Sequence, residues 1–122
     1  MDTFNPELFS LAMSNKAKPL LEAVKRHIAD NVDPITEEFY ALNKKKGDIW
    51  SHHPRQIELL EGAKKKARES GLWNFFLPDA ETGEGLKNLD YAYLAVELGR
   101  SPLSSQTLNC SAPDTGNMEV LE

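Results

Sequence analysis

The stretch PLLEAVKRHIADNVDPITEEFYAL, residues 19–42, decides the fold class of this chain. Its apolar residues recur at steps of four or three, which places them on one face of an α-helix. They are Leu20, Val24, Ile28, Val32, Ile35, Phe39 and Leu42. Pro34 removes a backbone hydrogen bond, which destabilises an isolated helix by roughly 3 kcal/mol. Because the pattern continues in phase across Pro34, we predict one long helix kinked near residues 30–34, in preference to two helices.

Start and stop signals predict further helices on both sides of this stretch. Asn5 before Pro6 begins a brief helix over residues 5–13, and a second helix opens at residues 51–54 and ends at Gly71. The residues expected to face inward in the second are Ile57, Leu60, Ala63 and Ala67. Residues 88–99 form another, and residues 101–107 can form a short one. The inventory is five or six helices, an all-α antiparallel bundle in one domain, 1–122.

Two connecting segments have distinctive compositions. LWNFFLP, residues 72–78, is too aromatic for a free loop and is predicted to be an extended segment packed against the core. Residues 78–85 form the main loop. Within it, the sequence Gly83-Glu84-Gly85 lacks a preceding strand, a third glycine and a P-loop lysine, so we predict a turn there and no phosphate site.

A final helix is predicted within NCSAPDTGNMEVL, residues 109–121. Ser111 and Asp114, with Pro113 between them, have the spacing of a capping box. Met118 and Leu121 then share one face, but no glycine, cation or proline ends the helix. We therefore expect the domain to be incomplete at its C-terminal end.

Composition limits the classes of partner. The chain has 122 residues, 19 of them acidic and 14 basic, and a net charge of −5, which argues against nucleic acid or an anionic membrane as the main partner. The basic runs at 44–46 and 64–66 lie near predicted helix ends, where a solvated structural role is expected. No window approaches the ~20 apolar residues of a membrane span. We expect a cytoplasmic protein, or a mitochondrial one if a presequence was lost.

The residues alone indicate no active site. Cys110 is the single cysteine, so it has no partner for an internal disulfide, and no histidine motif accompanies it as a base. Ser111 lacks the Gly-x-Ser-x-Gly turn of hydrolases, and the adjacent acids Glu37 and Glu38 are typical of a solvated surface. The three histidines do not have the spacing of metal ligands. On this basis the chain is an acidic helical domain.

Four blocks, in order, resemble the N-terminal helical domain of the acyl-CoA dehydrogenases. They are VDPITEEF at 32–39, ARESGLWNFFLPD at 67–79, NLDYAYLAVELGRS at 88–101 and SQTLNCSAPDTGNMEVL at 105–121. The string SAPDTGNME is similar to that of one branch of the family. The resemblance covers nearly the whole chain.

This resemblance implies an FAD-dependent oxidoreductase of fatty acid β-oxidation that desaturates an acyl-CoA between its α and β carbons. In such enzymes a carboxylate removes the α proton while FAD takes the β hydride. The family's FAD contacts and catalytic base lie mainly in a middle β domain and a C-terminal helical domain, so this chain alone is expected to be inactive. The implied partners are the acyl-CoA substrate, an electron-transfer protein and further copies in a homo-oligomer.

The resemblance also implies that the domain helps to wall the acyl-chain cavity. By position, the substrate-binding residues are Gln106 and Thr107, with Cys110 one turn on, where some straight-chain members have an acid. No catalytic, cofactor or metal residue is assigned. A solvent-exposed helix start remains the alternative for Gln106 and Thr107. For the chain, the alternatives are a free-standing helical interaction module and acyl-CoA oxidase chemistry.

Overall fold

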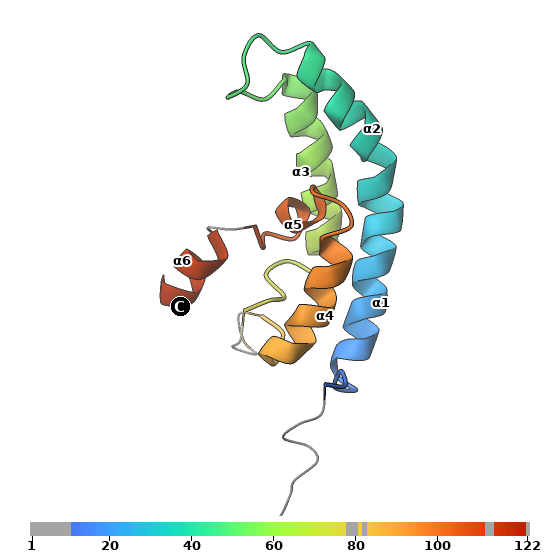
Figure 1. The fold of residues 1–122 in the computed structure, drawn as a ribbon, viewed down its shortest axis with the longest axis vertical. Coiled ribbons are helices and arrows are strands. Elements are labelled where there is room, and N and C mark those ends of the chain that lie inside the picture. Colours follow the sequence, from blue (N-terminus) through green and yellow to red (C-terminus); the bar gives the residue numbers. More distant parts are fainter. Residues whose placement is uncertain (1–10, 78–80, 82, 112–113, 122) are drawn as a thin grey trace, which may run out of the picture.

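A computed structural model describes residues 11–77, 81, 83–111 and 114–121. These residues form helices and no strand, which confirms the predicted all-α class (Figure 1). The α-helices are α1 (Ala17–His27), α2 (Asp33–Ala41), α3 (Pro54–Glu69), α4 (Asn88–Leu98), α5 (Ser104–Thr107) and α6 (Asp114–Leu121). The predicted first helix lies mostly outside the described residues, and its last part, residues 11–13, is not helical.

One long helix forms the back of the bundle, as the periodicity predicted. It consists of α1, a π-helical turn at Ile28–Val32, α2 and a 3-10 turn at Leu42–Lys44. Pro34 lies in the first turn of α2, where it has no N–H to donate. In the π-helical turn the amide of Asp33 donates to the carbonyl of Ile28, so the irregularity falls just ahead of the proline.

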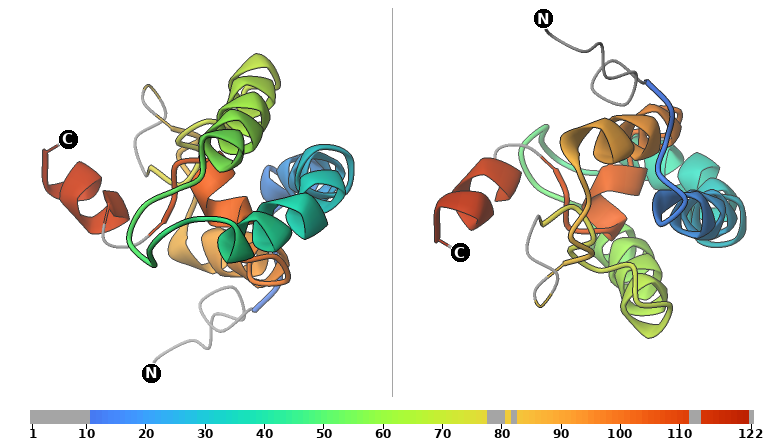
Figure 2. Two further views of the ribbon diagram at one scale, coloured as in Figure 1. Left: turned by 90° about the horizontal axis from the view of Figure 1, so that it is seen from above. Right: turned by 90° about the horizontal axis from the view of Figure 1, so that it is seen from below.

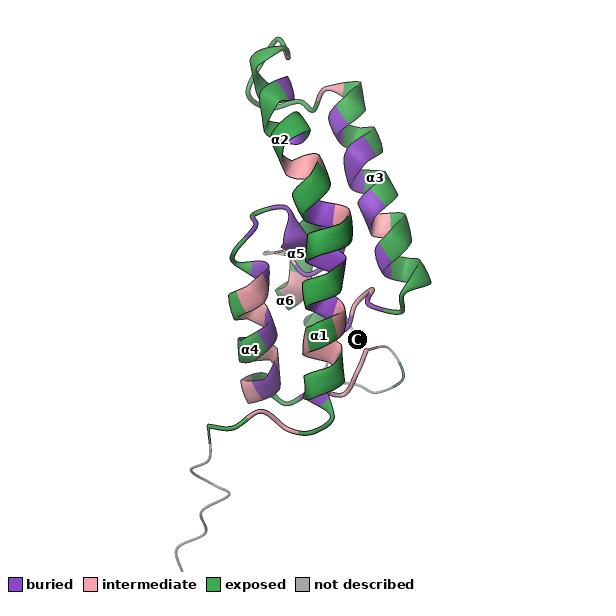
Figure 3. Ribbon diagram, turned by 90° about the vertical axis from the view of Figure 1, so that its right-hand side faces the viewer, coloured by how far each residue is buried: buried purple, intermediate pink, exposed green. Residues whose placement is uncertain are grey.

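The other helices pack against this long helix from two sides. α3 runs antiparallel to it and lies along α2, whereas α4 lies beside α1 (Figures 1 and 3). The short helix α5 lies between them and contacts both α3 and the π-helical turn. Figure 3 shows that the buried residues of α3 and α4 face the long helix. α6 stands to one side of the bundle, as both views of Figure 2 show.

The inward face of α3 differs from the prediction at one position. Leu60, Ala63 and Ala67 are buried as predicted, but Ile57 is 50% exposed. Gln56 is fully buried in its place, together with Leu59. A polar residue thus takes a core position, which is possible because its amide group is completely hydrogen-bonded.

Gln56 joins α3 to α2. Its Nε2 donates to the carbonyl oxygen of Phe39 at 2.8 Å and to Oδ1 of Asn43 at 2.7 Å, and its Oε1 accepts the amide of His53 at 2.9 Å. His53 is the N-cap of α3, and its Nδ1 accepts the amide of Arg55 at 3.1 Å. The helix start and the contact between helices are therefore held by the same side chains.

The aromatic segment after α3 is a series of turns, so the prediction of an extended conformation was wrong. Its packing was predicted correctly, because Leu72, Phe75, Phe76 and Leu77 are all buried. Gly71, which follows the C-cap of α3, has a left-handed φ of 75°, and Asn74 has a φ of 60°. Two left-handed residues turn the chain too sharply for a strand. No helix of the described residues is both long and apolar enough to cross a membrane.

Candidate functional site

The segment of residues 104–111, α5 and its exit, carries all three predicted site residues. It lies in the middle of the bundle because its apolar and small side chains pack against α3 and the π-helical turn. Leu108, Ser104 and Thr107 have no exposed surface. The hydroxyls of Ser101 and Ser104 are buried without a hydrogen-bond partner among the described residues, where ordered water is usual.

Thr107 is bound inside the domain by a residue of α1. Its Oγ1 lies 2.9 Å from Nε2 of His27 and donates to the carbonyl of Ser104 at 2.8 Å. On the other side of the imidazole, the side-chain amide of Asn31 lies 3.1 Å from Nδ1. With that amide donating to Nδ1, the imidazole is neutral and its Nε2–H donates to Thr107. Burial lowers the pKa of His27, which also favours the neutral ring.

Gln106, the preceding residue of the same helix, faces solvent. Its side chain is exposed and borders an open hollow that is lined by polar residues. The hollow is formed by Lys64, Gln106, Asn109, Ser111 and Asp114. Gln106 and Thr107 are neighbours in the sequence, but only Gln106 is available to a ligand at this surface.

Cys110 is buried at the exit of α5. The residue is 6% exposed, and its Sγ lies 3.5 Å from the carbonyl oxygen of Ser105, which also accepts the amide of Cys110 at 2.9 Å. Burial raises the pKa of the thiol to about 11. A thiol with that pKa is almost entirely protonated at neutral pH, so Cys110 presents an apolar surface and not a nucleophile.

Two asparagines attach this exit to the aromatic segment after α3. Both have left-handed backbones, with φ values of 60° for Asn74 and 59° for Asn109. Nδ2 of Asn109 donates to Oδ1 of Asn74 at 2.7 Å, and the amide of Asn74 donates to the carbonyl of Leu108 at 3.3 Å. Nδ2 of Asn109 also lies 3.6 Å from Sδ of Met118, which connects α6 to the site.

The three predicted residues thus share one segment but have three different environments. The residues that organise the segment, His27, Asn31 and the Asn74–Asn109 pair, were not singled out from the sequence. The sequence does indicate a contact between the first two. His27 and Asn31 are four residues apart beside the apolar stripe of the long helix, a spacing at which helical side chains can hydrogen-bond. Among the described residues there is no group of three or more potential metal ligands.

The curated relatives that the sequence matches are named as members of one family. No family model matches the sequence. The chain is 40% identical over 114 residues to acyl-CoA dehydrogenase family member 10 of Mus musculus, with 89% of this chain and 10% of that protein covered. It is 41% identical over 113 residues to acyl-CoA dehydrogenase family member 11 of Rattus norvegicus, with 90% of this chain and 14% of that protein covered.

A solved structure is similar to this chain in both fold and sequence. It is that of a protein from Mycobacterium abscessus, named provisionally as an acyl-CoA dehydrogenase. The TM-score is 0.75 and the identity 43%, over 90% of this chain and 28% of that one. The chain spans only about a tenth to a seventh of the length of these two curated relatives. Over nearly all of its own length, this chain is homologous to a helical part of acyl-CoA dehydrogenase family proteins.

Proposed function

We propose that this chain is the N-terminal helical domain of an FAD-dependent acyl-CoA dehydrogenase and that it helps to wall the acyl-chain cavity. The whole enzyme would remove two hydrogens from the α and β carbons of a fatty acyl-CoA. The observation that carries the proposal is the 43% identity to the M. abscessus protein over 90% of this chain, with a TM-score of 0.75. In this role the chain supplies surface and shape, and the reacting groups belong to other polypeptide.

The residues described here do not by themselves fit a flavin. An isoalloxazine ring needs an enclosed apolar slot with polar groups at its edge. The hollow beside Gln106 is instead open and bordered by a lysine, an aspartate, two amides and a serine. We therefore expect the isolated 122 residues to bind no flavin and to be inactive.

Gln106 is the residue of this chain that we propose to approach the acyl chain. Its side chain is exposed, whereas the hydroxyl of Thr107 is already bonded to His27 and Ser104. Thr107 and Cys110 would then contribute through packing, with Cys110 presenting a protonated, apolar thiol. A substitution at Gln106 should change the preference for acyl-chain length, while flavin content stays constant.

The decisive experiment uses the longer polypeptide that this proposal implies. We expect that polypeptide to be yellow and to reduce an artificial electron acceptor with acyl-CoA. Replacing Gln106 by Leu should change KM between short and long acyl chains, and Asn117→Ala, an exposed amide on α6, should not. Absence of flavin and of acyl-CoA oxidation would contradict the enzymatic proposal. Equal kinetics for Gln106→Leu and the parent enzyme would contradict only the placement of Gln106.

A helical interaction module is the second candidate, and one observation favours it. Val120 and Leu121 of α6 are 85% and 84% exposed, so this helix presents apolar surface to solvent. A protein that functions as a free module should be a cooperative, stable monomer when it has no partner. Aggregation of the purified 122 residues, reversed when further domains are attached, would instead support the dehydrogenase proposal.

A further inference from the structure

We propose that the loop between the long helix and α3 is a docking site for an anionic lipid surface. This loop, residues 45–53, connects the 3-10 turn Leu42–Lys44 to the start of α3 at Pro54. It lies at one end of the molecule's longest axis (Figure 1). A flat surface can therefore approach the tip of the loop before it meets the helices.

Two large apolar side chains project from the tip. Ile49 is 78% exposed and Trp50 is 89% exposed. Adjacent apolar residues of this size are normally buried, and an exposed pair indicates a binding surface. Tryptophan is also the side chain that favours the boundary between lipid headgroups and acyl chains, since its ring is apolar and its N–H can remain in water.

The shape of the tip is fixed by hydrogen bonds to one aspartate. Oδ1 of Asp48 accepts the amides of Trp50 at 2.6 Å and Ser51 at 2.7 Å, and Oδ2 accepts the hydroxyl of Ser51 at 2.8 Å. These bonds also lower the pKa of Asp48, with a smaller effect from Lys46. The carboxylate therefore remains charged and bonded, and the loop displays Ile49 and Trp50 without having to order on contact.

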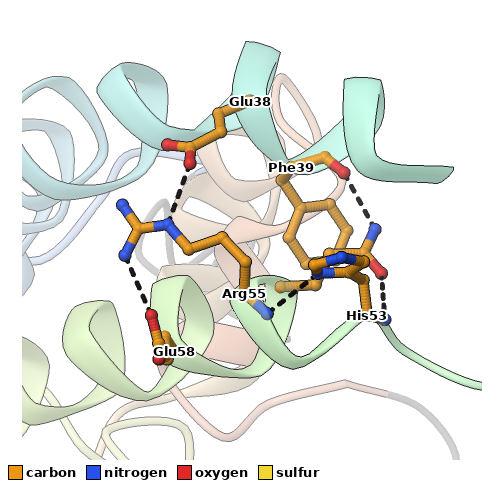
Figure 4. Close-up of polar contacts among 6 residues, drawn as sticks. Glu38, Phe39, His53, Arg55 and Glu58 are labelled. Carbon is orange, nitrogen blue, oxygen red and sulfur yellow. Dashed lines mark hydrogen bonds and ion pairs between the residues drawn. The ribbon is translucent and has the colours of Figure 1, made fainter. Parts of the chain in front are cut away.

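Charge complementarity selects lipid over protein as the partner. Lys44, Lys45 and Lys46 precede the tip, and no ion pair of theirs occurs within the described part of the chain. The acids Glu38 and Glu58, on the two flanking helices, are both paired with Arg55 (Figure 4). Lysine is depleted in protein–protein interfaces, whereas lysines beside an aromatic residue are typical of binding to anionic headgroups.

The other basic run has a different arrangement and supplies a matched control. Lys64 pairs with Glu61, and Lys65 lies 4.0 Å from Glu69. No comparably exposed tryptophan adjoins that run, because Trp73 is half-buried under the guanidinium of Arg68. The net charge of −5 describes the whole chain, and the loop is a local exception to it.

The test measures binding of the protein to vesicles of phosphatidylcholine, with and without phosphatidylserine. In a Trp73→Phe background the fluorescence comes from Trp50 alone. We expect a blue shift and quenching by brominated lipid only with phosphatidylserine vesicles. Trp50→Ser should lower the partition coefficient, measured by co-sedimentation with the vesicles, by roughly tenfold or more. Replacing Lys44, Lys45 and Lys46 by glutamine should lower it on the order of a hundredfold, at roughly fivefold per lysine.

The controls separate this proposal from its competitors. Glutamine at Lys64, Lys65 and Lys66, or serine at the exposed Val96, should leave binding unchanged. No binding to either vesicle, or equal loss with the two lysine sets, would overturn the proposal. Sedimentation of the protein alone gives the remaining outcome: a dimer that Trp50→Ser converts to monomer would show that a second copy of the chain covers the tip, and this too would overturn it.

Discussion

His27 and Thr107 lie 80 positions apart in the sequence, yet Nε2 of the first and Oγ1 of the second are 2.9 Å apart in the core. This bond joins the long helix to the segment that carries Gln106 and Cys110. It is part of a chain of three bonds from Asn31 to the carbonyl of Ser104. His27 uses both ring nitrogens and the Thr107 hydroxyl both accepts and donates, so loss of either side chain leaves a polar group of the other unpaired.

Acid should destabilise the protein through His27. Burial lowers the folded-state pKa of this histidine below its value of about 6.5 in the unfolded chain, so the unfolded state takes up the proton first. Its contribution to stability is complete above that unfolded value and falls as the pH drops towards the folded pKa. We expect the free energy of unfolding to fall between about pH 7 and pH 5 in urea titrations.

Two variants make this pH dependence specific. In His27→Gln the fall in this pH range should be reduced, since the titrating ring is gone. In His52→Gln, which alters an exposed histidine, the fall should be retained. An unchanged pH profile in His27→Gln would mean that other groups cause the acid sensitivity.

The hydroxyl of Thr107 should contribute more to the stability of the fold than its methyl group. Thr107→Val preserves the shape but leaves Nε2–H of His27 without an acceptor, which should lower the free energy of unfolding by about 1–3 kcal/mol. Thr107→Ser preserves the hydroxyl and removes one buried methyl group, which should lower the free energy of unfolding by about 1 kcal/mol. Urea unfolding of both variants measures the difference, and a valine variant as stable as the parent would contradict the bonded role of Thr107.

Gln56 and Gln106 form a matched pair of glutamines with opposite expectations. Gln56 is fully buried, and its side chain makes three hydrogen bonds: to Phe39 of α2, to Asn43 in the 3-10 turn and to the amide of His53 at the start of α3. Gln56→Ala should therefore cost about 2–4 kcal/mol. Gln106 is exposed, and Gln106→Ala should change stability by no more than about 0.5 kcal/mol. Thermal unfolding followed by circular dichroism compares the two, and similar losses would show that the contact at Gln56 is not specific.

Local patterns were sufficient for the long helix. The stripe from Leu20 to Leu42 predicted one kinked helix because hydrophobic period and proline chemistry both act within a few residues. The same reasoning failed at Gln56, since the burial of a polar side chain depends on acceptors from α2 that no local pattern identifies. It failed again at residues 72–77. Their composition correctly indicated burial, but the left-handed Asn74 turns the backbone and prevents the extended conformation that was predicted.

The candidate site was less predictable because its contacts are long-range. Gln106, Thr107 and Cys110 came from family resemblance, and their role at an acyl chain stays a prediction. The partner of Thr107 lies on another helix, so no window of sequence around residue 107 contains it. Exposure of Gln106 beside the buried Thr107 likewise follows from how α5 sits between α3 and the π-helical turn.

Cys110 should react with thiol reagents only when the fold opens. With a pKa of about 11, its thiolate fraction near pH 8 is on the order of a hundredfold smaller than that of a free cysteine, and the residue is buried. We expect slow modification of the native protein by a disulfide reagent and rapid modification in denaturant. Rapid reaction of the native thiol would show that the exit of α5 is open in solution.

Gly83 and Gly62 should respond in opposite directions to alanine. A Cβ at Gly83 would lie 2.7 Å from Cβ of Leu77 and would also meet the carbonyl oxygen of Leu77, so Gly83→Ala should destabilise the protein by about 1–3 kcal/mol. Gly62 lies within α3, and a Cβ there has no neighbour within 4 Å. Gly62→Ala should therefore stabilise by about 1 kcal/mol, because glycine is the poorer helix former. Chemical denaturation tests both, and a neutral Gly83→Ala would show that the backbone of the aromatic segment can move aside.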